Sequence, residues 1–256
     1  MSDQARTNTR PQARRTYPPG YGIVEPVANY RPWDVDDVFQ EVYRLVRDAT
    51  MVDIYRLWTL WFIASQVPAG DVLEVGSWRG GSGVVIARAL ERPRGGITSA
   101  GRETAGRETA GRDVFLADTF AGVVKASTRD TYYKGGEHAN TSVELVRGLL
   151  ERAGVPHVRL LPGVFPDDRG HEIEERSFAL CHIDVDVYQS ARETFEWVWP
   201  RMVPGGVVVF DDFGFYGCEG VTGLIGEIAG RPDGSGGRLT VIPSLSGQAM
   251  ITHPGY

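Results

Sequence analysis

The chain has 256 residues, 42% of them hydrophobic, which is enough to bury a full core as one large domain or two small ones. Its formal net charge of −6, with no Lys/Arg-rich block in the expected folded region, argues against nucleic-acid binding and favours a small-molecule partner. No apolar run reaches the roughly 20 residues that span a bilayer, and the N-terminus lacks the apolar segment of a signal peptide. We therefore expect a cytoplasmic protein that does not bind membranes.

Cysteine usage argues against a disulfide framework and against a zinc site. The two cysteines, Cys181 and Cys218, stand in neither a CxxC motif nor a His-rich neighbourhood. Both are interpreted as reduced, structural thiols.

The N-terminal segment, residues 1–33, is predicted to form an arm outside the folded domain. It contains five prolines among many Arg and polar residues and shows no apolar periodicity, so an isolated helix is not expected there. A segment of this composition cannot bury itself, and we expect it to become ordered on a partner subunit of a homo-oligomer. Residues 34–256 are predicted to form a single domain.

Two helices are expected at the start of this domain. Apolar residues recur at helical spacing from Val35 to Val46, after Asp34 as the predicted N-cap. A second helix is predicted at about residues 53–65, where Trp58 and Trp61 share an apolar face. We interpret both tryptophans as core residues.

The rest of the chain alternates short apolar runs with helical patterns. Strands are predicted at residues 72–75, 114–117, 158–161, 178–184, 207–210, 239–242 and 249–252. Helices are predicted between them at residues 81–90, 142–153, 189–199 and 220–228. This alternation requires crossover connections and a mainly parallel sheet, whereas the short link at residues 243–248 suits an antiparallel hairpin. The expected fold class is α/β, with a seven-stranded, mostly parallel sheet that contains one antiparallel strand.

A five-residue repeat interrupts this pattern. Residues 100–112 read AGRETAGRETAGR and have no hydrophobic face. We interpret them as a solvated insertion without a catalytic role, which a short Gly/Ser linker can replace.

The first predicted strand runs into a glycine-containing turn and a helix, in the segment DVLEVGSWRGGS. Gly76 lets the backbone approach a ligand closely, and the N-terminus of the following helix suits a carboxylate or phosphate. A dinucleotide is disfavoured, because Trp78 stands two residues after Gly76 and would crowd a pyrophosphate. Glu74 suits the ammonium group of S-adenosylmethionine, and Ser82 suits its carboxylate. The alternative is a helix-capping serine beside a strand-terminal acid.

Asp118, at the end of the second predicted strand, is interpreted as a cofactor-binding residue. An acid in this position binds the ribose diol in adenosine-binding α/β folds. An Asp at a strand end is otherwise often a helix N-cap, but Glu74 and Asp118 at adjacent strand ends support each other as cofactor contacts.

Acidic residues gather at the ends of two later strands. Asp184 and Asp186 follow one apolar strand, in the segment HIDVDVY, and Asp211 and Asp212 end the next strand. Parallel strands present their carboxyl ends at one edge of the sheet, where ligands bind. Carboxylates at such an edge repel one another unless a cation is present. The alternative is a loop start with solvated acids.

Asp184, Asp211 and Asp212 are the predicted metal ligands. Hard oxygen donors match Mg²⁺, with Mn²⁺ or Ca²⁺ as substitutes, and leave positions for two substrate oxygens such as those of a vicinal diol. The metal would act as a Lewis acid and hold the hydroxyl in line with the sulfonium methyl group. Asp184 and Asp186 are the predicted bases, and His182, two residues back inside the strand, is interpreted as structural.

Five segments taken together resemble a known family. In this order, EVGSWRGGS, ADTFAG, LLPGVFPDD, HIDVDVYQS and PGGVVVFDDF resemble the macrocin O-methyltransferase family, over about residues 51–252. The resemblance implies a Rossmann-like class I methyltransferase fold, S-adenosylmethionine, Mg²⁺ and a deoxysugar hydroxyl on an antibiotic glycoside as methyl acceptor. It also implies that Asp184 or Asp186 assists deprotonation. The positions that it implies for metal or cofactor binding are Asp184, Asp211, Asp212, Glu74, Gly76, Ser82 and Asp118.

Within the family, the pattern most resembles rhamnose-modifying members of enediyne-type pathways. It departs from the usual strand, which reads closer to L-D-G-D-M-Y, because Val185 and Val187 fill the intermediate positions. The identity of the base therefore stays open between Asp184, Asp186 and His182. Two other functions fit the sequence: a catechol-type metal-dependent O-methyltransferase, which uses the same carboxylates on an aromatic diol, and a non-catalytic cofactor-binding assembly protein.

Overall fold

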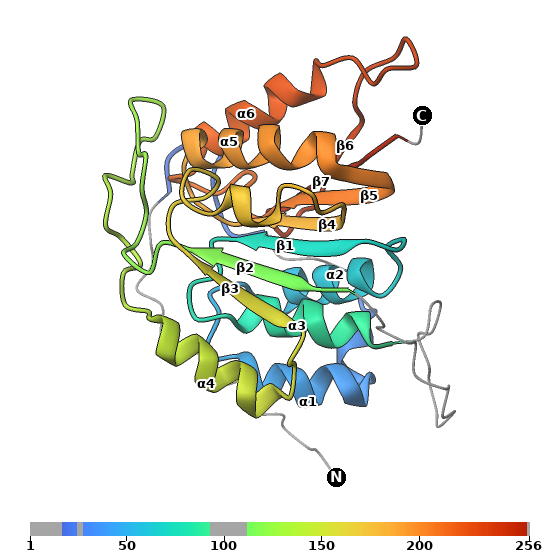
Figure 1. Ribbon diagram of the computed structural model, residues 1–256. Coiled ribbons are helices and arrows are strands. Elements are labelled where there is room, and N and C mark those ends of the chain that lie inside the picture. The colour runs from blue at the N-terminus through green and yellow to red at the C-terminus, as the bar shows by residue number, and fades with distance from the viewer. Residues whose placement is uncertain (1–16, 25–27, 93–111, 255–256) are drawn as a thin grey trace.

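The computed structural model describes residues 17–24, 28–92 and 112–254 of the chain (Figure 1). The repeat at residues 100–112 lies outside these ranges apart from Arg112, and so does about half of the predicted N-terminal arm. In the ranges that are described, no helix is long and apolar enough to cross a membrane.

The described residues form α-helices and strands in the predicted alternation. The helices are α1 (Asp37–Val46), α2 (Ile54–Ala64), α3 (Gly81–Leu90), α4 (Val143–Ala153), α5 (Tyr188–Val198) and α6 (Glu219–Ala229). The strands are β1 (Asp71–Val75), β2 (Val114–Asp118), β3 (Val158–Pro162), β4 (Phe178–Ile183), β5 (Met202–Phe210), β6 (Val241–Pro243) and β7 (Ala249–Thr252). The short 3-10 helices are η1 (Pro32–Asp34), η2 (Gly170–Ile173) and η3 (Trp199–Arg201).

The strands form one seven-stranded sheet with the order β3-β2-β1-β4-β5-β7-β6. β1 pairs in parallel with β2 and β4, and β4 pairs in parallel with β5. β7 runs antiparallel to both of its neighbours, β5 and β6. The predicted α/β class, Rossmann-like and with one reversed strand, is confirmed.

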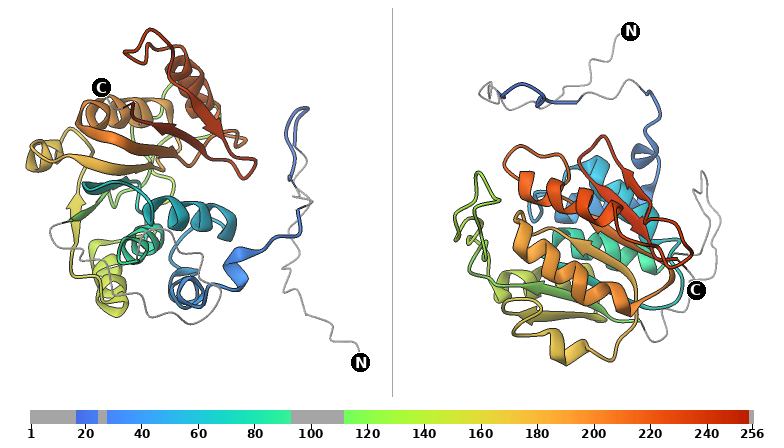
Figure 2. Two further views of the ribbon diagram at one scale, coloured as in Figure 1. Left: turned by 90° about the vertical axis from the view of Figure 1, so that its right-hand side faces the viewer. Right: turned by 90° about the horizontal axis from the view of Figure 1, so that it is seen from above.

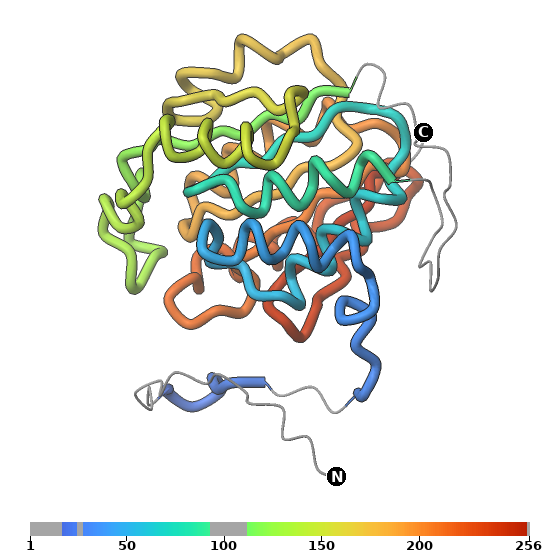
Figure 3. Tube along the Cα trace, turned by 90° about the horizontal axis from the view of Figure 1, so that it is seen from below, coloured from blue at the N-terminus to red at the C-terminus, as the bar shows by residue number. Residues whose placement is uncertain are grey.

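Helices cover both faces of the sheet. α1 to α4 lie on one face and α5 and α6 on the other (Figure 1), and the turned views in Figure 2 show the same layers. Figure 3 shows α1, α3 and α4 side by side over the first face. The core has two parts accordingly, one that includes Leu57 and Trp61 and one that includes Phe195 and Leu224. Trp61 is 1% exposed, as expected for a core residue, and Trp58 packs partly buried against the same cluster.

The start of α1 corrects one prediction. Its N-cap is Asp36, whose carboxylate accepts a hydrogen bond from the backbone N–H of Phe39 at 2.9 Å. Asp34, the predicted N-cap, instead lies in η1, which begins at Pro32. A proline suits the first turn of a helix because it has no N–H to leave unbonded, and this extra turn moves the start of α1 toward the C-terminus.

Two strand boundaries also differ from the prediction. β5 begins at Met202 rather than residue 207 and includes Pro204–Gly206, where the pairing shifts from Met202 opposite Phe178 to Val207 opposite Leu180. The additional residues form an irregularity within the strand. β6 begins at Val241 rather than residue 239, because the N–H of Leu239 bonds to the carbonyl of Arg231 instead of joining the sheet.

Candidate active site

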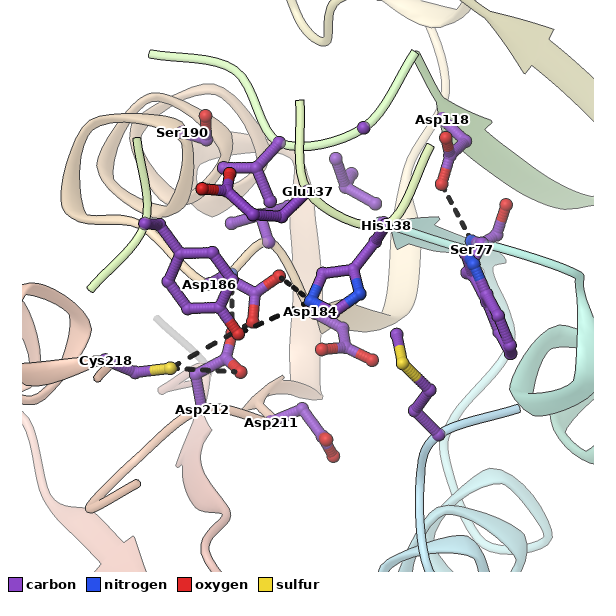
Figure 4. Close-up of a pocket in the computed structure, with 18 of the residues that line it drawn as sticks. Ser77, Asp118, Glu137, His138, Asp184, Asp186, Ser190, Asp211, Asp212 and Cys218 are labelled. Carbon is purple, nitrogen blue, oxygen red and sulfur yellow. Dashed lines mark hydrogen bonds and ion pairs between the residues drawn. The ribbon is translucent and has the colours of Figure 1, made fainter. Parts of the chain in front are cut away.

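A cavity of about 790 Å³ opens where the parallel strands β1, β2, β4 and β5 end. The turn after β1 forms one side of it, and the residues after β4 and β5 form its floor (Figure 4). The loop at residues 119–142 and the segment at residues 215–218 supply further wall residues. This edge is where ligands bind in open α/β sheets.

The turn after β1 brings several small polar residues to the cavity. Gly76 has a φ of 93°, and a Cβ there would lie 1.6 Å from the carbonyl oxygen of Asp184. Glycine is thus required because the turn approaches the end of β4, and not because of a ligand alone. Ser77 is 2% exposed, and its hydroxyl has no hydrogen-bond partner among the described residues. Ser82 lines the cavity at the first turn of α3, whose N-terminus has no side-chain cap.

Asp118 lines the cavity at the end of β2. Its carboxylate accepts hydrogen bonds from the backbone N–H groups of Trp78 and Phe120, both at 2.7 Å. Burial raises the pKa of Asp118, although these two hydrogen bonds act in the opposite direction. The carboxylate therefore fixes the turn after β1 as well as facing the cavity.

Glu74 does not reach the cavity, which corrects the expected contact with an ammonium group. It is fully buried in β1, and its Oε1 atom lies 2.8 Å from Nδ1 of His182 on the neighbouring strand β4. Its Oε2 atom has no hydrogen-bond partner in the described part of the chain and lies against Gly83 of α3. The side chain at this position of β1 points into the layer between sheet and helix, where bound ligands have no access.

His182 occupies the same buried layer, beneath the acids at the strand ends. Its Nε2 atom lies 3.3 Å from Oδ1 of Asp211, so the ring joins Glu74 to Asp211. Burial opposes the charged form of His182, but the hydrogen bonds to Asp211 and Glu74 outweigh it and raise its pKa to about 10. Because both ring nitrogens are occupied and the residue is fully buried, His182 cannot touch a bound substrate.

Asp211 is held by donors on every side. Its Oδ2 atom forms an ion pair with Arg56 of α2, and its Oδ1 atom accepts a hydrogen bond from the Gln248 amide at 2.7 Å as well as facing His182. Burial alone would raise the pKa of Asp211, but Arg56 and His182 lower it. The carboxylate is therefore stabilised in its charged form.

The environment of the Asp184 carboxylate differs from that of Asp211. Asp184 is half-buried at the cavity wall, and no side chain in the described ranges donates a hydrogen bond to its carboxylate. Burial, together with the nearby charges of Asp211 and Asp212, raises the pKa of Asp184 well above its ordinary value. A positive ligand in the cavity would relieve this cost.

Asp212 faces a second group of side chains. Its carboxylate accepts a hydrogen bond from the backbone N–H of Asp186 at 2.8 Å, and Sγ of Cys218 lies 3.8 Å from it. The structure thus places His182, Asp184 and Asp211 in one possible metal-binding group, and Asp186, Asp212 and Cys218 in another. The three predicted ligands lie at one strand edge but divide between two adjacent groups, Asp184 and Asp211 in the first and Asp212 in the second. Burial, with Asp186 and Asp211 nearby, raises the pKa of Asp212 as well.

Three further residues of the site were not predicted from the sequence. Arg56 of α2 and the loop residues Tyr133 and His138 all line the cavity. No spacing pattern marks them, because the loop has no periodicity and Arg56 sits in an otherwise apolar helix. Cys218, predicted to be a structural thiol, is buried but also borders the acids, and burial raises its pKa.

The order of the strands and the position of the cavity define a methyltransferase-like α/β fold. The solved structure of the O-methyltransferase NovP has the same fold, with a TM-score of 0.61 and 23% sequence identity over 80% of this chain and 82% of that one. The model of the macrocin-O-methyltransferase (TylF) family matches residues 49–223. The chain belongs to this family.

Two curated relatives have related sequences. One is the 8-demethyl-8-(2,3-dimethoxy-alpha-L-rhamnosyl)-tetracenomycin-C 4'-O-methyltransferase of Streptomyces olivaceus, 32% identical over 66% of this chain and 64% of that protein. The other is the mycinamicin III 3''-O-methyltransferase of Micromonospora griseorubida, 31% identical over 59% of this chain and 58% of that protein. The match therefore spans less than two thirds of the length of either relative.

Proposed function

We propose that the protein is an S-adenosylmethionine-dependent O-methyltransferase that methylates a deoxysugar hydroxyl on a glycosylated natural product, with the help of a divalent metal ion. The family supports methyl transfer to oxygen, and the names of both relatives describe O-methylation, in one case of a rhamnosyl-tetracenomycin. The observation that carries the proposal is the Asp184 carboxylate, which lies at the cavity wall beside two further acids and has no side-chain donor in the part of the chain that the structure describes.

The side of the cavity formed by β1, β2 and α3 fits S-adenosylmethionine. The buried hydroxyl of Ser77 has no partner among the described residues, and the N-terminus of α3 beside Ser82, which has no side-chain cap, suits a carboxylate. Asp118 at the end of β2 suits the ribose hydroxyls. Gly76 lets the turn lie close to the end of β4. Glu74 does not line the cavity, and its carboxylate contacts His182 in the buried layer beneath the site.

The acids on the other side fit a hard divalent cation. Asp184, Asp211 and Asp212 are the proposed ligands, and Mg²⁺ is the proposed ion, with Mn²⁺ or Ca²⁺ as substitutes. Within the described ranges no side chain bonds the Asp184 carboxylate, whereas Asp211 shares its Oδ2 atom with Arg56, so metal binding through Asp211 competes with this ion pair. A bound Mg²⁺ ion would supply Lewis-acid stabilisation of the deprotonated hydroxyl.

A catechol-type acceptor is the second candidate, and one observation favours it. Tyr132, Tyr133, Phe215 and Tyr216 all line the cavity, and an aromatic wall suits a flat apolar acceptor. The same wall also suits the aromatic aglycone of a glycoside. The acceptor class therefore has to be measured.

The test is transfer of a labelled methyl group from S-adenosylmethionine to a panel of aryl α-L-rhamnosides, other deoxysugar glycosides and simple catechols, in the presence of Mg²⁺. We expect product with the glycosides and little with the catechols. Product with catechols alone would make the second candidate correct, and no product with any acceptor would contradict the proposed function.

A further inference from the structure

Three tyrosines form the mouth of the cavity: Tyr17, Tyr132 and Tyr216. Tyr132 is 64% exposed and Tyr216 is 53% exposed, whereas Asp212 on the floor of the cavity is buried. The ring of Tyr17, from the N-terminal segment, meets the ring of Tyr216 edge to face at a centroid distance of 6.2 Å. Exposed aromatic side chains thus lie at the outer end of the site, and buried acids lie at its inner end.

A short stretch of chain connects the mouth to these acids. Tyr216 and Cys218 are two residues apart, so their Cα atoms lie within about 7 Å of each other. Sγ of Cys218 lies 3.8 Å from Oδ1 of Asp212. A hydroxyl held at the acids is therefore separated from Tyr216 by a distance that one sugar ring can span. In a glycoside, the group on the far side of that ring is the aglycone.

Positively charged side chains are scarce in the cavity lining within the described ranges. Arg56 is the only Lys or Arg there, and its guanidinium already pairs with Asp211 and Asp53. The diphosphate of a nucleotide sugar is usually bound by Lys or Arg side chains, and the carboxylates of the lining would repel it. This lining therefore favours a neutral aglycone over a nucleoside diphosphate.

Glu219, the first residue of α6, holds the elements of the mouth together. Its Oε1 atom accepts a hydrogen bond from the backbone N–H of Gly217 at 3.0 Å, and its Oε2 atom accepts one from the hydroxyl of Thr131. Burial alone would raise the pKa of Glu219, but these hydrogen bonds and one from Tyr21 lower it. Tyr132 packs against Gly217, where an added Cβ would lie 3.1 Å from the Cβ of Tyr132. One carboxylate thus ties the N-terminal segment and the loop that carries Tyr132 to the start of α6.

We propose that the three tyrosines of the mouth bind a planar aromatic aglycone of the acceptor glycoside, and that Glu219 positions them. The inference rests on the proposed function and narrows its substrate class. Aromatic rings stack or pack edge to face at centroid distances of about 4.5–7 Å, and binding would also remove exposed aromatic surface from water. The sugar is therefore methylated after its attachment to the aglycone, so the reaction that supplies the substrate is glycosyl transfer to an aromatic compound.

The test compares three derivatives of the deoxysugar that is methylated in the acceptor panel: its 2-naphthyl glycoside, its methyl glycoside and its deoxythymidine diphosphate ester. The kcat and KM of methyl transfer would be measured for the wild type, Tyr132→Ala, Tyr216→Ala and Tyr132→Phe. The control is Tyr30→Ala, because Tyr30 is about as exposed as Tyr132 but does not line the cavity. Calorimetry with S-adenosylmethionine and thermal unfolding would show that each variant folds and binds the methyl donor.

The wild type should have the highest kcat/KM with the naphthyl glycoside. Each alanine variant at the mouth should lower the ratio of the naphthyl to the methyl kcat/KM by about two- to tenfold, the equivalent of one aromatic contact. This fall should come mainly from a higher KM for the naphthyl glycoside. Tyr132→Phe keeps the ring and should keep the ratio, as should Tyr30→Ala.

Equal kcat/KM values of the wild type for the naphthyl and methyl glycosides would overturn the aglycone site and leave the proposed function intact. Equal losses with both glycosides in the alanine variants would do the same, because the tyrosines would then act on the sugar. A preference for the nucleoside diphosphate sugar, or no transfer to any glycoside, would overturn the proposed function as well.

The positioning role of Glu219 is tested by a double-mutant cycle. Glu219→Ala should lower the ratio of the naphthyl to the methyl kcat/KM in the wild-type background. It should have almost no further effect in a background that carries both Tyr132→Ala and Tyr216→Ala. Equal falls in the two backgrounds would show that Glu219 acts independently of the tyrosines and would contradict its positioning role.

Discussion

Arg56 in α2 and Asp211 at the end of β5 form a buried ion pair at the floor of the cavity. The guanidinium also bonds Asp53, the N-cap of α2, at 2.8 Å and stacks over Phe215 at 4.8 Å from the ring centre. A fixed positive charge thus lies beside the strand ends where a divalent cation is proposed. In the metal-free protein, Arg56 balances the negative charge of Asp211. A bound cation would compete with Arg56 for the same carboxylate.

Arg56→Met should therefore destabilise the protein in the absence of metal, because Asp211 is left buried without a counter-charge. Breaking a buried pair in this way costs about 3–5 kcal/mol of unfolding free energy. Mg²⁺ should then raise the Tm of Arg56→Met by more than it raises the wild-type Tm. The control is Arg47→Met, because Arg47 is 61% exposed and its contact with Asp48 is 3.9 Å long. Equal stability of the two variants, or a smaller Mg²⁺ shift in Arg56→Met, would contradict the competition.

The link from Glu74 through His182 to Asp211 predicts a pH-dependent stability. The pKa of His182 is raised from 6.5 to about 10 on folding, so its contribution is fully present below pH 6.5 and is lost as the pH rises to about 10. The difference in unfolding free energy between the wild type and His182→Gln should therefore shrink over this window. Denaturant titrations at the two ends of this pH window measure the difference in unfolding free energy. A difference that stays constant would show that His182 is neutral in the folded protein.

The hydroxyl of Ser77, which no described residue bonds, predicts a contact with the methyl donor. Ser77→Ala should weaken S-adenosylmethionine binding about tenfold, the equivalent of one hydrogen bond to a charged group. Asp118→Ala should weaken it as well, since Asp118 also holds the backbone of Trp78. Ser190→Ala is the matched control, because its cavity-lining hydroxyl already bonds the carbonyl of Val124 at 3.1 Å. Calorimetry that shows unchanged affinity in Ser77→Ala, or NAD binding as tight as S-adenosylmethionine, would contradict the cofactor assignment.

The described part of the N-terminal segment predicts a role in substrate capture. The rings of Tyr17 and Tyr21 contact Tyr216, at centroid distances of 6.2 Å and 5.4 Å, and Tyr17 and Tyr216 line the cavity. Removing residues 1–24 should raise the KM for a glycoside up to about tenfold, from the loss of two aromatic contacts, and leave the Tm nearly unchanged. An unchanged KM would exclude the role.

Self-association of the full chain remains a prediction from the composition of the N-terminal segment. Light scattering on the full-length protein and on the form lacking residues 1–33 would test it. We expect an oligomer that the deletion weakens. A monomeric full-length protein at micromolar concentration would contradict the prediction.

Much of the fold was predictable because apolar runs report burial directly. The pattern around Val72–Val75 and at Phe178–Ile183 identified parallel strands, and the short link before β7 identified the reversed strand. The carboxyl ends of these strands then placed Asp184 and Asp118 at one cavity. Such inferences need only strand direction and sheet connectivity.

The direction of individual side chains was not predictable in the same way. Glu74 was expected in the cavity, but its position in β1 pairs it with His182 across the sheet. The ion pair between Arg56 and Asp211 was not predictable either, because no local pattern links residues so far apart in the chain. His138 is not predictable from the sequence, because the long loop that carries it is shaped by contacts to Trp78 and Val123 rather than by periodicity.

Methyl transfer by this protein is predicted to depend on a divalent cation held by Asp184, Asp211 and Asp212. The most direct measurement is transfer of labelled methyl groups to an aryl α-L-rhamnoside by the wild type and by single Asp→Asn variants at these positions, in chelator and after addition of Mg²⁺. We expect the wild type to be inactive in chelator and to recover with Mg²⁺, and each variant to lose at least roughly 10²-fold with nearly normal S-adenosylmethionine affinity, since even outer-shell changes cost about 10–100-fold. Equal transfer in chelator and in Mg²⁺ would contradict the metal dependence. So would normal activity of a variant with Asp→Asn at all three positions.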